Sequence, residues 1–168
     1  MTATALSQSI LIVDDTPDNL TVLRQILTRH GYRVRPAISG EIALKAIQAD
    51  PPDLILLDIL MPGMDGFEVC RKLKINQNTR RIPIIFISAL DDEDEKVRAF
   101  EEGGADYITK PFNSGEVLAR INTQLTISAL TGQLKQKTIQ FRKALDDIRH
   151  LRASRHLCPD CKKELDKG

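Results

Sequence analysis

Polar side chains that could do chemistry stand at the ends of four apolar runs in this chain. Three of the runs have the length and the apolar composition of a buried strand, and the fourth, Tyr107-Ile108-Thr109, is short. The polar residues that follow the runs are Asp14 and Asp15, Asp58, Ser88, and Lys110. Because the carboxyl ends of parallel strands meet at one edge of a sheet, we expect three acids, a hydroxyl and an amine to share one site.

Three carboxylates gathered in one place repel one another, and all three stay ionised only around a cation. Oxygen ligands alone suit a hard divalent ion, and Mg²⁺, which keeps several waters, fits a site of few carboxylates that also serves phosphate. Asp58 would then be the nucleophile that forms an acyl phosphate. Lys110 and the hydroxyl of Ser88 would clamp the phosphoryl oxygens. The set predicts a Mg²⁺-dependent phosphoacceptor site.

Any one of these aspartates, taken alone, is more often a turn former or a helix cap than a nucleophile. The acids, the hydroxyl and the lysine occur together, however, at successive strand ends. This joint occurrence is far harder to obtain by chance, so we favour the functional interpretation.

The residues around these positions resemble the receiver domain of two-component response regulators. The resemblance covers about residues 8–126 and rests on short motifs at the strand ends. The motifs are Val13-Asp14-Asp15, Leu57-Asp58 with Met61-Pro62-Gly63-Met64-Asp65-Gly66, Ile87-Ser88-Ala89, and Gly104-Ala105-Asp106-Tyr107 with Lys110-Pro111-Phe112.

The resemblance implies a role for each site residue. Asp15 would ligate Mg²⁺ directly and Asp14 through water, with Asp58 and the backbone carbonyl of Leu60 completing the protein ligands. Asp58 would accept phosphate from a histidine kinase or a phosphotransfer protein. Ser88 and Lys110 would contact the phosphoryl oxygens, Ser88 moving toward them on activation, and Tyr107 would swing inward to fill the vacated space. The bond between Lys110 and Pro111 is expected to be cis, as it usually is in receivers.

Two positions differ from many relatives. Leu60, two residues after Asp58, and Leu90, two residues after Ser88, are apolar where related receivers often carry polar side chains. In receivers these two positions flank the path of the water that hydrolyses the acyl phosphate. We therefore expect self-dephosphorylation at a different rate, slower rather than faster.

Strands are expected near residues 9–14, 32–37, 53–58, 82–88 and 106–109, with helical patterns between them. The fourth helix is marked by Val97 and Phe100 and by an acidic entry, residues 91–95, where negative charge favours a helix N-terminus. Strand alternating with helix five times predicts an α/β fold with a parallel sheet covered on both faces. The resemblance makes this a flavodoxin-like, doubly wound (βα)5 sheet with strand order 2-1-3-4-5, over residues 8–126.

A fifth helix, capped by Asn113 or Ser114, is expected to run for over 40 residues. From residue 127 to residue 157 it shows a heptad pattern typical of a coiled coil. Position a holds Ile127, Leu134, Phe141, Ile148 and Arg155, and position d holds Leu130, Lys137, Ala144, Leu151 and Cys158. Eight of these ten are apolar or Cys, which predicts a homodimer. The alternative is an amphipathic helix that folds back on its own receiver.

The last segment, residues 158–168, contains one Cys-x-x-Cys pair, Cys158 and Cys161. One such pair supplies only two of the four ligands of a structural zinc site. A parallel dimer would bring two pairs together, a redox pair is a second interpretation, and a disordered end is the commonest outcome.

Composition limits the classes of protein. The chain has 168 residues, of which 42% are hydrophobic and 28% are charged, and three cysteines, which do not make a disulfide framework. It shows no membrane span and no signal peptide, so we expect a cytoplasmic protein. Residues 1–126 hold 14 Lys and Arg against 18 Asp and Glu, whereas residues 127–168 hold 10 against 5. We interpret the basic tail as a solvated helix surface rather than a nucleic-acid contact, because no recognition motif accompanies it.

The sequence therefore predicts a phosphorylation-activated response regulator that signals through a dimerising helix. A haloacid-dehalogenase-type phosphatase also uses an Asp nucleophile with Mg²⁺, but it carries a second acid two residues later, where this chain has Leu60. We thus expect no turnover enzyme. The alternatives are the N-terminal regulatory piece of a larger effector, such as an adenylate cyclase, a diguanylate cyclase or a hybrid kinase, or a constitutive dimerisation module with a degenerate site.

Overall fold

The computed structural model describes residues 8–89 and 92–155, with side chains as far as residue 151. Leu90 and the acid at position 91 lie outside these residues, and so do Cys158 and Cys161, the possible zinc ligands. Strands and helices alternate along the described chain. They are β1 (Ser9–Val13), α1 (Pro17–Arg29), β2 (Arg33–Ala37), α2 (Gly40–Ala49), β3 (Leu54–Asp58), α3 (Gly66–Ile75), β4 (Ile84–Ser88), α4 (Glu93–Glu101), β5 (Asp106–Thr109) and α5 (Ser114–Arg155).

The five strands form one parallel sheet in the order β2-β1-β3-β4-β5, as predicted. The register aligns the carboxyl ends of the inner strands. Val13 pairs with Leu57, Asp58 with Ile87, and Ser88 with Thr109. The residues that end these strands, or directly follow them, are therefore brought to one edge of the sheet.

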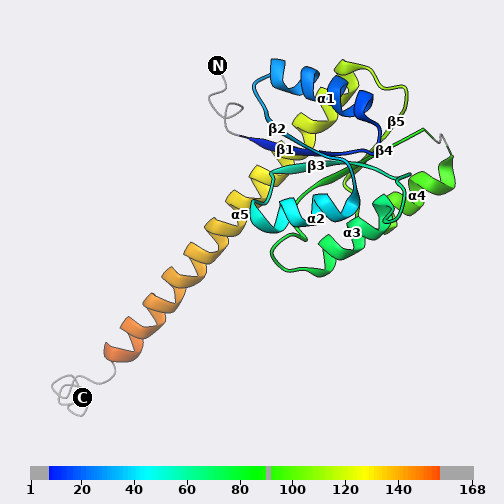
Figure 1. The fold of residues 1–168 in the computed structure, drawn as a ribbon. Coiled ribbons are helices and arrows are strands. Elements are labelled where there is room, and N and C mark those ends of the chain that lie inside the picture. Colours follow the sequence, from blue (N-terminus) through cyan, green and yellow to red (C-terminus); the bar gives the residue numbers. More distant parts are fainter. Residues whose placement is uncertain (1–7, 90–91, 156–168) are drawn as a thin grey trace, which may run out of the picture. The chain divides into compact units, whose positions relative to one another are not determined.

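Helices cover both faces of the sheet (Figure 1). One core contains residues of α2, α3 and α4 packed on the strands, including Phe67 and Phe86. The other contains residues of α1 and the first part of α5, including Leu23 and Ile121, packed on strand residues such as Ile12. Alternate strand residues enter opposite cores because successive side chains of a strand point to opposite faces. The doubly wound fold is thus confirmed.

Helix starts agree with the capping residues in the sequence. The side chain of Asp65 accepts a hydrogen bond from the backbone N–H of Glu68 (2.7 Å), which caps α3. Asn113 accepts one from the N–H of Glu116 (2.7 Å) and so caps α5, one of the two predicted candidates. These caps satisfy backbone donors that have no partner within the helix.

Helix α4 lies where the sequence predicts it, but the residues that marked it are not its core. Val97 and Phe100 are exposed, and Ala99 is the one buried residue among those of α4. The helix packs on the core through the small side chain of Ala99, which belongs to the same core as Phe67 and Phe86.

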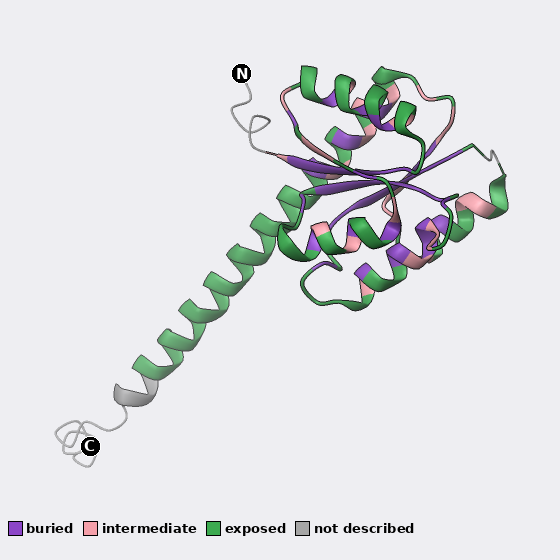
Figure 2. Cartoon of the chain, viewed as in Figure 1, coloured by how far each residue is buried: buried purple, intermediate pink, exposed green. Residues whose placement is uncertain are grey.

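Helix α5 is continuous over 42 residues. The chain divides into two compact units after Ser128. In the second unit every residue from 129 to 151 is exposed (Figure 2). Gly132 does not interrupt the helix. Nothing lies within 4 Å of the position that its Cβ would take, so a side chain would fit there. Among the described residues, no helix is long and apolar enough to cross a membrane.

Candidate functional site

The strand ends bring Lys110 into contact with two of the predicted acids. The Nζ atom of Lys110 lies 2.8 Å from Oδ2 of Asp14 and 3.2 Å from Oδ2 of Asp58. The two carboxylates are almost completely buried, and the lysine side chain is mostly buried. Residues that are 44 and 52 positions apart in the chain thus meet because β1, β3 and β5 are parallel and end at the same edge.

Asp14 is held by three further hydrogen bonds. Its Oδ1 accepts from the backbone N–H of Thr16 (2.8 Å), and the side-chain amide of Asn19 donates to Oδ1 and Oδ2 (3.1 and 3.0 Å). Asn19 was not recognised from the sequence. The available signal was its place in the first turn of α1, five residues after Asp14, where its amide faces back toward the strand end.

The ionised form of Asp58 is disfavoured in the folded protein. The pKa of Asp58 is raised from 3.8 to about 6, and burial is the largest cause. The charge of Lys110 and its hydrogen bond act to lower this pKa, while the negative charges of Asp14 and Asp15 act with burial to raise it. A single ammonium group therefore does not compensate the burial and the neighbouring acids.

Lys110 responds in the complementary way. Burial disfavours its charged form, but the hydrogen bonds and negative charges of Asp14 and Asp58 outweigh burial, so the pKa of Lys110 is raised. The lysine is thus held as a cation beside Asp58, where it can attract the oxygens of an anionic group.

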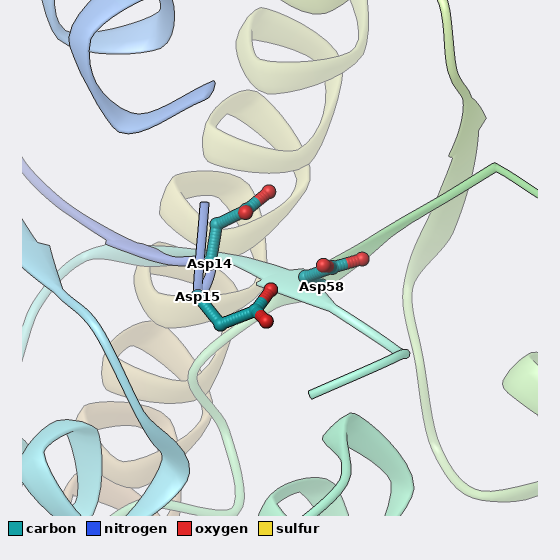
Figure 3. Close-up of side chains that lie close together, drawn as sticks. All are labelled: Asp14, Asp15 and Asp58. Carbon is teal, nitrogen blue, oxygen red and sulfur yellow. The ribbon is translucent and has the colours of Figure 1, made fainter. Parts of the chain in front are cut away.

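The three acids form a cluster that could hold a metal ion. Asp14, Asp15 and Asp58 each offer one carboxylate oxygen, and these oxygens all lie within 4.8 Å of one another. Figure 3 shows the three side chains at the ends of neighbouring strands. Asp15 is exposed whereas the other two are buried, so an ion would be open to water on one side. Lys110 bonds two of the three carboxylates, and a divalent cation would balance the remaining negative charge.

Ser88 and Tyr107 are linked by an acid that the sequence reasoning did not assign to the site. The hydroxyl of Ser88 donates to Oε2 of Glu95 (3.1 Å), and the hydroxyl of Tyr107 donates to the same oxygen (3.0 Å). Ser88 is fully buried and Tyr107 is 5% exposed, so the aromatic ring already lies inside the protein. Glu95 belongs to the acidic entry of α4, which the sequence explained only by the helix N-terminus.

The loops around the site are tightly packed. Gly66 begins α3, and a Cβ there would meet the carbonyl oxygen of Asp58 at 2.3 Å. The backbone N–H of Lys110 donates to the carbonyl of Ser88 (2.7 Å), and the Lys110–Pro111 bond is cis, as expected. Leu60 follows β3 and is 54% exposed.

Comparison with known proteins agrees with this geometry. The sequence matches the response regulator receiver domain family over residues 10–122. It is 40% identical over 138 residues to the response regulator PleD of Caulobacter vibrioides, covering 82% of this chain and 30% of PleD. It is 38% identical over 149 residues to the alkaline phosphatase synthesis transcriptional regulatory protein PhoP of Bacillus subtilis, covering 87% of this chain and 61% of PhoP.

A solved structure shows the same architecture. The signal receiver domain of a signal transduction histidine kinase from Syntrophus aciditrophicus superposes with a TM-score of 0.66 at 37% identity, covering 71% of this chain and 90% of that domain. This chain belongs to the response regulator receiver domain family, because the family match spans most of its length. Receivers of this family accept phosphoryl groups from histidine kinases and are activated by phosphorylation. The chain spans less than two thirds of PleD and of PhoP.

Proposed function

We propose that Asp58 is the residue that accepts the phosphoryl group in this receiver, from a phosphohistidine of a histidine kinase or of a phosphotransfer protein. The observation that carries the proposal is the placement of a buried carboxylate in contact with Lys110 and within reach of two further acids. Asp58 is also the acid of the cluster whose pKa is raised, which is common for groups at functional sites.

In the transfer step, a carboxylate oxygen of Asp58 attacks phosphorus, and a P–O bond forms as the P–N bond to the imidazole breaks. The electron pair of the P–N bond goes to the imidazole nitrogen, which takes up a proton. Lys110 would contact a phosphoryl oxygen through the ammonium group that now bonds Asp14 and Asp58. Hydrolysis later removes the phosphoryl group: water attacks phosphorus, and the bond from phosphorus to Asp58 breaks. These are single events on the protein's own side chain, so we infer no turnover reaction for this domain.

Mg²⁺ fits the donor set of the site, which consists of carboxylate oxygens. Asp14, Asp15, Asp58 and the carbonyl of Leu60 would hold it, and when bound it would neutralise charge on the phosphoryl oxygens. The protein's own share is to keep Asp14 oriented through Asn19 and to keep Lys110 charged.

Phosphorylation by a small donor tests the assignment directly. Wild-type protein with acetyl phosphate and Mg²⁺ should gain one phosphoryl group, detected by intact mass, and Asp58→Asn should gain none. Asp50→Asn is the matched control, because it makes the same chemical change at a half-exposed surface acid. Labelling of Asp58→Asn to the wild-type extent would refute the assignment, as would a requirement for another residue in place of Asp58.

We further propose that residues 127–157 continue the fifth helix of a receiver spanning residues 8–126 and pair with a second copy of the chain. Within the described residues, seven of the nine heptad a and d positions are apolar, and Lys137 and Arg155 are the exceptions. Large side chains at these positions are exposed in the single chain, Phe141 to 67% and Leu134 to 69%. A helical segment whose residues 129–151 are all exposed in the single chain is stabilised by a partner helix.

Two substitutions separate pairing from a general effect of charge. Phe141→Glu places a charge at position a, whereas Ile139→Glu places it at position f, although both side chains are more than half exposed in the single chain. We expect light scattering to give a dimer for wild type and for Ile139→Glu, and a monomer for Phe141→Glu. A monomeric wild type, or equal masses for the two variants, would remove the proposed coiled coil.

A further inference from the structure

Glu95 binds both Ser88 and Tyr107 through one oxygen atom. Its Oε2 accepts the hydroxyl of Ser88 at 3.1 Å and the hydroxyl of Tyr107 at 3.0 Å. Ser88 ends β4, Tyr107 lies in β5, and Glu95 lies in the first turn of α4. Three neighbouring elements are therefore joined at a single carboxylate.

The hydrogen bond of Ser88 to Glu95 competes with any bond from the same hydroxyl to a phosphoryl group. A serine hydroxyl has a single hydrogen to donate, whereas carboxylates and phosphoryl oxygens only accept. Ser88 can therefore donate to Glu95 or to a phosphoryl oxygen on Asp58, but not to both. A hydrogen bond to a charged acceptor is stronger than a neutral one, so the contact with Glu95 has a measurable cost to break.

We propose that Glu95 is a positioning residue that holds the hydroxyl of Ser88 in the unphosphorylated arrangement and releases it when Asp58 is phosphorylated. This inference rests on the proposed role of Asp58. The bond from Ser88 to Glu95 stabilises only the resting state, since the same hydroxyl hydrogen is needed at the phosphoryl group in the activated state. A contact that is present in one state and absent in the other shifts the equilibrium between them.

Helix α4 is anchored to the sheet by few apolar side chains, so the hydrogen bonds of Glu95 matter for its position. Only Ala99 is buried among the residues of α4. The guanidinium of Arg98 lies 4.2 Å from the centre of the Phe67 ring, and Nζ of Lys96 lies 5.9 Å from the centre of the Tyr107 ring. The two hydrogen bonds of Glu95 directly connect the first turn of α4 to β4 and β5. We expect the loss of the bond from Ser88 to change the position of α4.

Beryllofluoride, which occupies the place of the phosphoryl group on an aspartate, measures the effect without a kinase. In the presence of Mg²⁺ we expect Glu95→Ala to bind beryllofluoride about tenfold more tightly than wild type, which is about 1.4 kcal/mol. Glu95→Gln, which keeps an acceptor oxygen but loses the charge, should give a smaller gain of about threefold. Glu93→Gln is the matched control, because it makes the same change at an exposed position of the same helix turn and should bind as wild type does.

Removing Ser88 tests whether the effect passes through its hydroxyl. In a double-mutant cycle, Glu95→Ala should tighten binding about tenfold in the wild-type background and hardly at all in the Ser88→Ala background. An equal gain in both backgrounds would overturn the competition for Ser88. Unchanged or weaker binding by Glu95→Ala and Glu95→Gln would overturn the role of Glu95.

The same titrations distinguish this inference from the proposed role of Asp58. If neither wild type nor Asp58→Asn binds beryllofluoride, the phosphoacceptor assignment itself fails. If wild type binds and Asp58→Asn does not, the assignment stands and the Glu95 variants alone decide the inference. Amide chemical shifts of Ser88 and Tyr107 give an independent reading: in Glu95→Gln without beryllofluoride they should lie between the free and the bound wild-type positions, and shifts equal to those of free wild type would contradict the proposal.

Discussion

Removing the charge of Asp58 is expected to stabilise this protein at neutral pH when no divalent metal is present. Burial is the main reason that the pKa of Asp58 is about 6 in the folded protein, compared with 3.8 for an unperturbed group. Each unit of this pKa difference corresponds to about 1.4 kcal/mol, so ionised Asp58 lowers the folding stability by roughly 3 kcal/mol. Asparagine keeps the shape of the side chain and leaves Lys110 its bond to Asp14.

The sign of the pH dependence follows from proton binding. Folded protein binds the proton of Asp58 more tightly than unfolded chain, so the wild type loses stability as the pH rises from about 4 to about 6. Below about pH 4 both states hold the proton, and the variant should have no advantage there. Above about pH 6 the advantage of Asp58→Asn should reach its full size.

Urea unfolding followed by circular dichroism, in the presence of a chelator, measures this difference. At pH 7 we expect Asp58→Asn to unfold with a free energy higher than wild type by roughly 3 kcal/mol. Asp50→Asn should be neutral or slightly destabilising, because its carboxylate makes only half-exposed ion pairs with Arg33 and Arg35. Adding Mg²⁺ should stabilise the wild type and narrow the gap. A variant no more stable than wild type at pH 7, or a gap that is constant with pH, would refute the reasoning.

Four further substitutions test other features. Gly66→Ala should lower the free energy of unfolding by about 2 kcal/mol or more, since its Cβ would meet the carbonyl of Asp58 at 2.3 Å. Gly132→Ala has nothing within 4 Å of its Cβ and should raise helix stability by about 1 kcal/mol. Thermal melts of the two variants measure both effects. Leu60→Asn should shorten the lifetime of the acyl phosphate, measured by loss of label, and an unchanged decay would refute a role for the apolar residue. Lys137→Leu, at a heptad d position, should lower the dimer dissociation constant by at least tenfold in sedimentation experiments, and weaker association would contradict the assigned register.

Local patterns were sufficient for the fold because each strand and helix carries its own signal. The runs before Asp14, Asp58 and Ser88 are buried strands in the structure, and the sheet order expected from the resemblance is observed. Buried parallel strands read as continuous apolar runs since both faces are covered by helices. The caps of α3 and α5 agree with the sequence for the same reason, because a cap depends on residues only three positions apart.

Apolar residues alone did not reveal which side of α4 is buried. Val97 and Phe100 suggested a core face, yet they are exposed, and the small Ala99 packs on the sheet instead. The space left by the other side chains on that face decides which residue fits, and this is a property of the assembled core.

The contacts between distant residues came only from the tertiary structure. Asn19 and Glu95 look like ordinary polar residues of helix first turns, where their types are favoured in any case. Their side chains reach Asp14 and the hydroxyls of Ser88 and Tyr107 because of how α1 and α4 pack on the sheet. The pKa of Asp58 is likewise set by burial and by charges from other strands.

The sequence by itself determined the class of fold and the members of the acidic site, because strand ends in a parallel sheet must converge and their residue types are legible one strand at a time. Only the tertiary structure decided how these groups are paired: Lys110 bonds two acids, and Ser88 bonds Glu95. The physical reason is that a hydrogen bond depends on distances of about 3 Å between side chains from separate elements, and these distances are set by packing.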